Sequence, residues 1–258
     1  MVRADAEQAI ALDETLGEAH IALAVYKASY EWDWQGAERE FKRGIQLNPS
    51  HATGYQWYAE FLASQGRVDE ALKEIRRARD LDPASRIIQT VVGLIYYRAH
   101  RFDDVIEQCA ETLDFDPDFP YAHYTLGLAY AEKAMFEEAI SEINEAIALG
   151  GRSTEYVTAL AYVYAAAKMS DQAARILDEL KRRAKTQYVA AYDFAFIHAG
   201  LGDEDAAFRW LDLAVEERGQ DLSWLLKVDP KLESLHSDPR FADLLRRVGF
   251  EPTAAPST

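Results

Sequence analysis

One spacing recurs along the chain: small residues and helix-ending residues repeat every 34 positions. The prolines Pro49, Pro83 and Pro117 are 34 residues apart, and a glycine, Gly151, stands at the next step. Two further series keep the same period, namely Ala37, Ala71, Val105, Ala139, Ala173 and Ala207, and Ala59, Gly93, Gly127, Ala161 and Ala195. A repeated unit of this length can bury its apolar face only against neighbouring units, so that all units share one continuous core. The spacing therefore predicts an all-α fold, an α-solenoid of stacked helix pairs.

Each mark of the repeat has a physical reason. A small residue midway along a helix lets two helix backbones approach closely, so that ridges fill grooves. Larger residues flank it, as Leu126 and Tyr130 do around Gly127, so that one stripe of each helix faces the core. A proline after the second helix ends that helix, because proline has no backbone N–H. Each unit is thus expected to consist of a helix, a short turn and a second helix.

The best-matching unit carries His123, Leu126, Gly127, Tyr130, Ala139, Ile143 and Ala146. At these residues the chain resembles the tetratricopeptide-repeat (TPR) family, whose pattern is W-x2-L-G-x2-Y, then A-x3-F, then A and P. The resemblance covers about residues 17–220 and implies about six units in a superhelix, with ligands bound on a concave face that the first helices line. In the first unit, Leu23 and Ala24 are one residue out of phase with the second helix. This shift predicts a one-residue insertion near Glu31–Asp33.

The two ends of the chain depart from the repeat. Residues 1–14 resemble the second helix of a preceding unit, which suggests a fragment of a longer chain; a native start with an atypical cap is the alternative. Residues 221–250 contain two Asp-Pro dipeptides, each typical of a helix start, and predict a helical cap over the last apolar face. This ending resembles that of bacterial TPR regions that follow transcription-regulator, cyclase or kinase domains. Residues 251–258 are expected to be disordered.

The charge balance excludes several classes of partner. The chain has 258 residues, with 28 basic and 44 acidic side chains and a formal net charge of −16. Binding to nucleic acid and adsorption to anionic membranes both need clustered positive charge, so neither is expected. The longest apolar stretch without charge, residues 156–167, is shorter than the roughly 20 residues that a membrane span needs. No basic and apolar leader follows Met1, and we expect a cytoplasmic location.

Residues of the types that act in catalysis or metal binding are scattered along the sequence. The six histidines show no metal-ligand spacing such as HExxH and are interpreted as structural. The Asp-rich segment 114–118 opens like a calcium loop, but Phe119 stands where that loop requires glycine. The single cysteine, Cys109, excludes an internal disulfide and is interpreted as a small core residue. We therefore predict no catalytic residue, no cofactor and no metal site, and interpret the chain as non-enzymatic.

The expected concave face is rich in aromatic residues. Twenty positions of the first helices in the second to sixth units point away from the core stripe, and among them only Glu60 and Glu155 are charged. The candidate partner-binding residues on this face are Tyr97, Tyr121, Tyr124, Leu128, Tyr162, Tyr192 and Phe196. An exposed aromatic lining indicates an interaction surface, because tyrosine offers contact area together with a polar group. The alternative is that neighbouring first helices bury these side chains against one another.

These features predict a non-catalytic scaffold that binds a peptide or a partner protein in a concave aromatic and apolar groove. Chaperone-binding TPR proteins hold a C-terminal carboxylate with asparagine and lysine on this face, whereas Asn48 and Asn144 lie elsewhere in this chain. The alternative function is a regulatory or sensory segment of a larger bacterial signalling protein, in contact with its own kinase, cyclase or winged-helix domain. A hydrolase built on the solenoid is a third, weaker hypothesis.

Overall fold

The computed structural model describes residues 2–250, and within them every regular element is a helix. In chain order these are α1 (Val2–Leu12), α2 (Gly17–Tyr26), the π-helix η1 (Lys27–Glu31), α3 (Trp34–Leu47), α4 (Ala52–Ser64), α5 (Val68–Leu81), α6 (Arg86–Arg98), α7 (Phe102–Phe115), α8 (Pro120–Glu132), α9 (Phe136–Gly150), α10 (Thr154–Ala166), α11 (Ser170–Arg183), α12 (Ala191–Gly200), α13 (Glu204–Glu216), α14 (Gln220–Leu225), the 3-10 helix η2 (Pro230–Leu235) and α15 (Pro239–Arg247). In this range, every helix is too short or too polar to cross a lipid bilayer. The predicted disorder of residues 251–258 falls outside the described residues.

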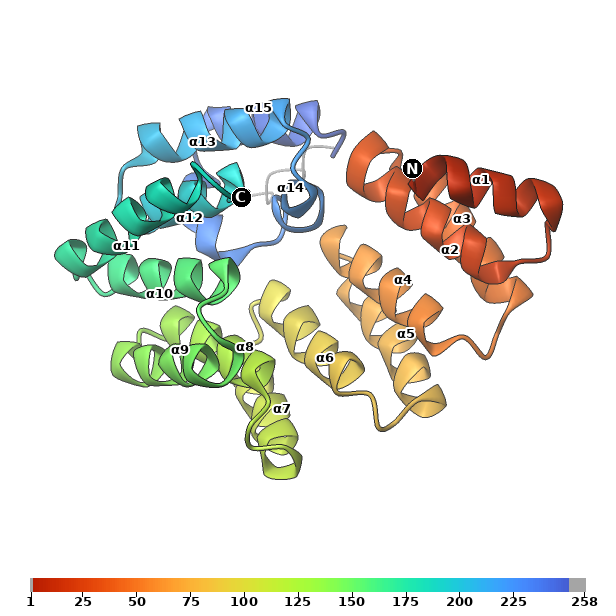
Figure 1. Ribbon diagram of the computed structural model, residues 1–258, viewed down its shortest axis with the longest axis horizontal. Helices are drawn as coiled ribbons and strands as arrows, with labels where there is room; N and C mark the ends of the chain where they lie inside the picture. Colours follow the sequence, from red (N-terminus) through yellow and green to blue (C-terminus); the bar gives the residue numbers. More distant parts are fainter. Residues whose placement is uncertain (1, 251–258) are drawn as a thin grey trace, which may run out of the picture.

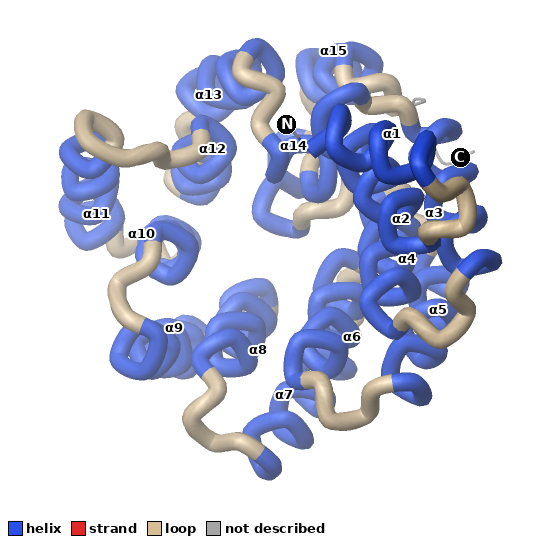
Figure 2. The backbone as a smooth tube through the Cα atoms, turned by 45° about the vertical axis from the view of Figure 1, so that its right-hand side comes forward, coloured by secondary structure: helices blue, strands red, loops and turns tan. Residues whose placement is uncertain are grey.

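Successive helix pairs make up most of the fold: α2 with α3, α4 with α5, α6 with α7, α8 with α9, α10 with α11 and α12 with α13. The first helix of each pair packs against the first helix of the next and lies on the inside of the arc, with the second helices outside (Figure 2). The small residues of the second helices, from Ala37 to Ala207, are all 0% exposed, as close helix packing requires. The predicted all-α solenoid is confirmed.

The turn inside each pair holds one residue in the left-handed backbone conformation. These residues are Trp32, Gly66, His100, Ala134, Lys168 and Gly202, with φ between 57° and 77° and a spacing of 34. In this conformation the Cβ atom of an L-residue lies close to the following carbonyl oxygen, which favours glycine. Only two of the six turns have glycine, so the other four store local strain.

The first pair contains one residue more than the later pairs, and this residue lies at the end of its first helix. Because Trp32 keeps the phase of the five later turn residues, the extra residue must precede it. There, Lys27–Glu31 forms a π-helix, which holds one residue more per hydrogen-bonded turn than an α-helix. The predicted one-residue insertion is present, but it lies in η1, before Trp32, and not at Trp32 or Asp33 of the predicted range Glu31–Asp33.

Removing the strain from one turn gives a first prediction. Ala134→Gly is expected to raise the free energy of unfolding by about 1 kcal/mol, because Ala134 is exposed and loses only a methyl group that its φ of 58° disfavours. The matched control is Ala110→Gly, at an exposed position inside α7, which is expected to lower the free energy of unfolding by about 1 kcal/mol. Urea denaturation measures both changes. Changes of the same sign in the two variants would contradict the assignment of strain.

After α13 the chain turns back and closes the arc into a helical ring (Figure 1). In this C-terminal segment, residues 220–250, α15 packs on α13 and η2 on α12, whereas α14 contacts α4 and η1 at the other end of the array. Trp224 on α14 donates its Nε1–H to Ser29 Oγ at 3.0 Å, and Lys227 Nζ donates to the carbonyl of Gln65 at 3.0 Å. The segment thus joins the last repeat to the first two, a connection that the sequence does not predict.

The two ends of the array also meet through aromatic side chains. Phe250 stacks on Trp34 with ring centroids 4.6 Å apart, and Trp34 Nε1 donates to the carbonyl of Val248 at 3.2 Å. Gly249 between them has φ 81°, and a Cβ atom there would lie 3.2 Å from Trp34 Nε1. Both the backbone conformation and the close approach of the indole therefore require glycine at this joint.

The Asp-Pro dipeptides begin the two helical elements of this segment, as predicted. Asp229 accepts a hydrogen bond from the backbone N–H of Lys231 at 3.1 Å, and Asp238 accepts one from that of Arg240 at 2.8 Å. Proline takes the first position of each element. Capping of this kind fixes the entry of the chain into η2 and α15.

Candidate functional site

The helical ring encloses a cavity, and most of the predicted concave-face residues line it. Six of them contact this space, namely Tyr97, Tyr121, Tyr124, Leu128, Tyr192 and Phe196. The seventh, Tyr162, packs edge-on against Phe196 with ring centroids 6.0 Å apart. Tyr121 and Tyr124 are half-buried, whereas the other five are at most 7% exposed. The structure brings these residues together but buries most of them, and their role in partner binding stays a prediction.

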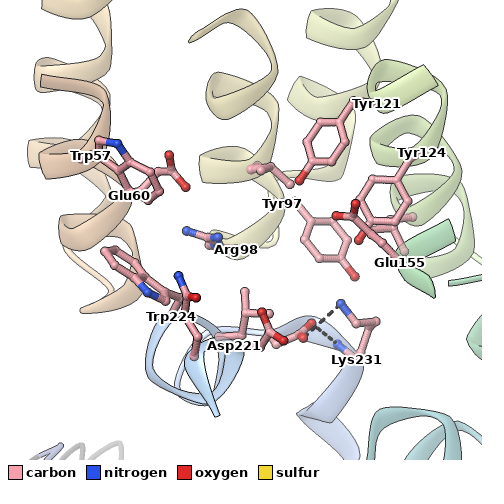
Figure 3. A pocket seen from close by; sticks show the side chains of 15 residues that line it. Trp57, Glu60, Tyr97, Arg98, Tyr121, Tyr124, Glu155, Asp221, Trp224 and Lys231 are labelled. Atoms are coloured by element: carbon pink, nitrogen blue, oxygen red, sulfur yellow. Dashed lines mark hydrogen bonds and ion pairs between the residues drawn. The ribbon is translucent and has the colours of Figure 1, made fainter. Parts of the chain in front are cut away.

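The cavity has two joined lobes of about 220 and 250 Å³. The lobes share Tyr124, Leu128, Glu155, Asp221, Leu225 and Lys231. The first lobe extends towards Trp57 and Glu60 on α4 and Arg98 on α6 (Figure 3). The second extends towards Tyr192 and Asp193 on α12. First helices of the repeats form the wall, and the C-terminal segment closes it from the other side.

A buried ion pair anchors the C-terminal segment in this position. Asp229 is 1% exposed and accepts hydrogen bonds from Tyr192 Oη at 2.8 Å and from the Lys231 backbone. Lys231 Nζ lies 3.0 Å from Asp229 Oδ2 and 4.9 Å from the ring centroid of Phe196. The ammonium group is therefore held between a carboxylate and an aromatic face, a favourable arrangement away from bulk water.

A second carboxylate, that of the half-buried Glu132 on α8, joins three consecutive repeats. Tyr97 and Tyr162 both donate to Glu132 Oε1, each at 2.9 Å. Burial and the charge of Glu132 hold the pKa of Tyr97 well above its usual range, so the phenol keeps its proton and donates. Burial also raises the pKa of Glu132, although the two phenol hydrogen bonds oppose that rise. This network fixes the orientation of two of the predicted concave-face tyrosines.

Four further carboxylates line the cavity without an ion-pair partner among residues 2–250, namely Glu60, Glu155, Asp193 and Asp221. Loss of water inside the helical ring raises the pKa of Glu155 and of Asp221. The same cause, reinforced by the charge of Asp221, raises the pKa of Asp193 to about 7. Glu155 and Asp221 are nevertheless exposed to solvent in the cavity. The positive charge of Lys231 opposes each of these rises without cancelling it.

Sequence reasoning identified Glu60 and Glu155 but missed most of the charge in the cavity. Arg98 and Asp193 lie one residue beyond the positions assigned to the concave face, since they directly follow Tyr97 and Tyr192. The remaining charged groups come from the C-terminal segment, which has no repeat to place it. The Asp-Pro dipeptide at Asp229 was the one available signal, and it indicates a helix start without revealing burial.

The histidines that the structure pairs with glutamates, and the single cysteine, contribute to packing between helices. His20 and His123 occupy equivalent positions, and each bonds through Nδ1 to a glutamate of the following helix, Glu40 at 2.7 Å and Glu142 at 2.6 Å. Cys109 is 2% exposed, and burial raises the pKa of its thiol to about 12. In the described part of the chain, no group of three or more His, Cys, Asp or Glu residues is arranged to hold a metal ion.

Comparison with solved structures shows the TPR fold. PilW, a widely conserved type IV pilus biogenesis factor, is 17% identical, with a TM-score of 0.56 over 85% of this chain and 97% of PilW. PilF of Pseudomonas aeruginosa is 16% identical, with a TM-score of 0.53 over 82% of this chain and 96% of PilF. A chain of the APC/C hetero-tetramer Cut9–Hcn1 is 16% identical, with a TM-score of 0.64 over 96% of this chain and 45% of that one.

Sequence comparison identifies the family. The curated proteins give no significant match. A family profile described as "T7SS, ESX-1 secretion system protein EccA1, N-terminal domain" matches residues 43–180, which is more than half of the chain. The matched range runs from α3 into α11 and contains most of the wall of the cavity. This TPR protein therefore belongs to the family of the EccA1 N-terminal domain.

Proposed function

We propose that this chain is a non-catalytic protein-interaction module that receives a segment of a partner protein in the central cavity. Its fold is that of protein-binding scaffolds. The observation that supports the site is the joined cavity itself, with Trp57, Tyr121, Tyr124 and Trp224 around solvent-exposed carboxylates. Aromatic side chains of this kind supply binding energy with little loss of conformational freedom.

The proposed site is smaller than the groove that the sequence predicts. Since α14 and η2 cover part of the concave face, the open part is the cavity between them and the first helices. The descriptions of related proteins fit a binding component of a larger assembly: the family is named for a secretion-system protein, and PilW is a pilus biogenesis factor. A partner segment entering the cavity would contact both the repeats and the C-terminal segment.

Site-specific photo-cross-linking in lysate of the source organism tests this proposal. A benzophenone amino acid at position 124, which borders both lobes, is expected to capture a partner protein. The matched control carries the same group at position 115, where the native Phe115 is 74% exposed and lies outside the cavity. Capture from position 124 but not from position 115 supports the proposal. Equal capture from both positions, or cross-links at position 124 confined to the chain's own C-terminal segment, would contradict it.

A further inference from the structure

The cavity combines aromatic walls with an excess of carboxylates. Its lining carries the carboxylates of Glu60, Glu155, Asp193, Asp221 and Asp229, against two basic side chains, Arg98 and Lys231. Lys231 is paired with Asp229. Arg98 forms no ion pair within residues 2–250, and its positive charge opposes the raised pKa of Glu60. The carboxylates left over are those of Glu155, Asp193 and Asp221.

The chain itself shows how this cavity accommodates a cation. Lys231, only 8% exposed, places its Nζ atom 3.0 Å from a carboxylate oxygen of Asp229, 4.9 Å from the ring centroid of Phe196 and 5.7 Å from that of Tyr97. An ammonium group thus lies among aromatic faces beside one carboxylate. Glu155 and Asp221 offer a second set of carboxylates in the same space, with Tyr124 on the shared wall of both lobes.

We propose that the cavity binds an organic cation, an ammonium or guanidinium group on a flexible aliphatic chain, between Glu155 and Asp221. The source of the cation is a lysine or arginine side chain of the bound segment, so the inference rests on the proposed function for its source. Carboxylates that are open to solvent, lack ion-pair partners and lie next to aromatic faces attract such a group by charge-assisted hydrogen bonds and by cation–π contact.

Titration calorimetry with small probes tests the proposal without knowledge of the partner. The probes are the capped tripeptide acetyl-Ala-Arg-Ala-amide, the same peptide with neutral citrulline in place of arginine, and 1,4-diaminobutane. We expect the arginine peptide to bind about tenfold more tightly than the citrulline peptide, because one charged hydrogen-bonded contact is worth at least that much. The double variant Glu155→Gln/Asp221→Asn is expected to lose about the same factor for the arginine peptide.

The control variants distinguish binding at Glu155 and Asp221 from non-specific attraction of a cation to an acidic protein. Glu155 and Asp221 form no ion pair within residues 2–250, so their neutral variants should fold with unchanged or raised thermal stability. The double variant Glu137→Gln/Glu138→Gln removes the same charge from exposed positions at the start of α9 and should bind the arginine peptide like wild type. Equal binding of the two peptides, or equal losses in the two double variants, would overturn the proposal.

Two outcomes separate this inference from the proposed function. If diaminobutane binds and the peptides do not, a partner side chain is overturned as the source of the cation. If no probe binds while photo-cross-linking at position 124 still captures a partner, the cation site is overturned and the proposed function stands.

Discussion

Replacing Trp224 by alanine is expected to lower the free energy of unfolding by about 3–5 kcal/mol, the range for deleting a large buried aromatic side chain. Trp224 is 7% exposed, and its ring centroid lies 5.9 Å from that of Trp57 on α4. The substitution also leaves the hydroxyl of Ser29, which is fully buried, without the indole donor. Urea denaturation followed by circular dichroism measures the loss.

Hydrogen exchange shows whether this loss comes from opening the helical ring. In Trp224→Ala, amide protection should fall in α14 and in η1, the two elements that the indole connects. The matched control is Trp210→Ala on α13, where the indole stacks on Phe194 of the same pair with centroids 4.4 Å apart. Trp210→Ala should also destabilise the protein, but its loss of amide protection should not be concentrated in α14 and η1. Identical exchange patterns in the two variants would show that Trp224 does not hold the joint.

The second large effect is expected for Asp229→Ala, which should lower the free energy of unfolding by about 3–5 kcal/mol. Asp229 is 1% exposed and is the counter-ion of Lys231, itself 8% exposed. Without the carboxylate, a buried ammonium loses its partner and the hydroxyl of Tyr192 loses its acceptor. Thermal and urea unfolding at neutral pH measure this change.

A double-mutant cycle with Lys231→Met separates the ion pair from simple loss of packing. If the cost of Asp229→Ala comes from an unpaired buried charge, removing that charge should restore part of the stability. Asp229→Ala/Lys231→Met is therefore expected to be less destabilised than the sum of the single variants, by more than about 1 kcal/mol. Additive effects would mean that the ion pair contributes nothing beyond the separate contacts of its two members.

The repeat itself was predictable because its signal is local and periodic. Ala37 and its five successors mark a close helix contact every 34 residues, and each contact joins elements that are neighbours in sequence. The phase shift at Leu23 even predicted the extra residue that η1 absorbs. The left-handed turns were less visible, because His100, Ala134 and Lys168 occupy a conformation that a sequence usually marks with glycine.

The closure of the ring and most of the charge in the cavity were not predictable by the same means. The hydrogen bond from Trp224 to Ser29 joins residues 195 positions apart, and that from Trp34 to Val248 spans 214 positions. Such contacts occur once and leave no period in the sequence. The placement of Asp221 and Lys231 in the cavity depends on them, so the candidate site could be predicted for its aromatic wall but not for the side that the C-terminal segment supplies.

The joint between α14, η1 and α4 also changes how the whole chain can come apart. In an open stack each terminal unit contacts only one neighbour, so the terminal units unfold first and the superhelix can extend along its axis. Here the last repeat is tied to the first two through Trp224 and the stacked Phe250 and Trp34, so the six repeats form a closed ring. Opening any one repeat must then strain the joint as well. We therefore expect partial unfolding from the ends of the array to be suppressed and the repeats to unfold in a single cooperative transition.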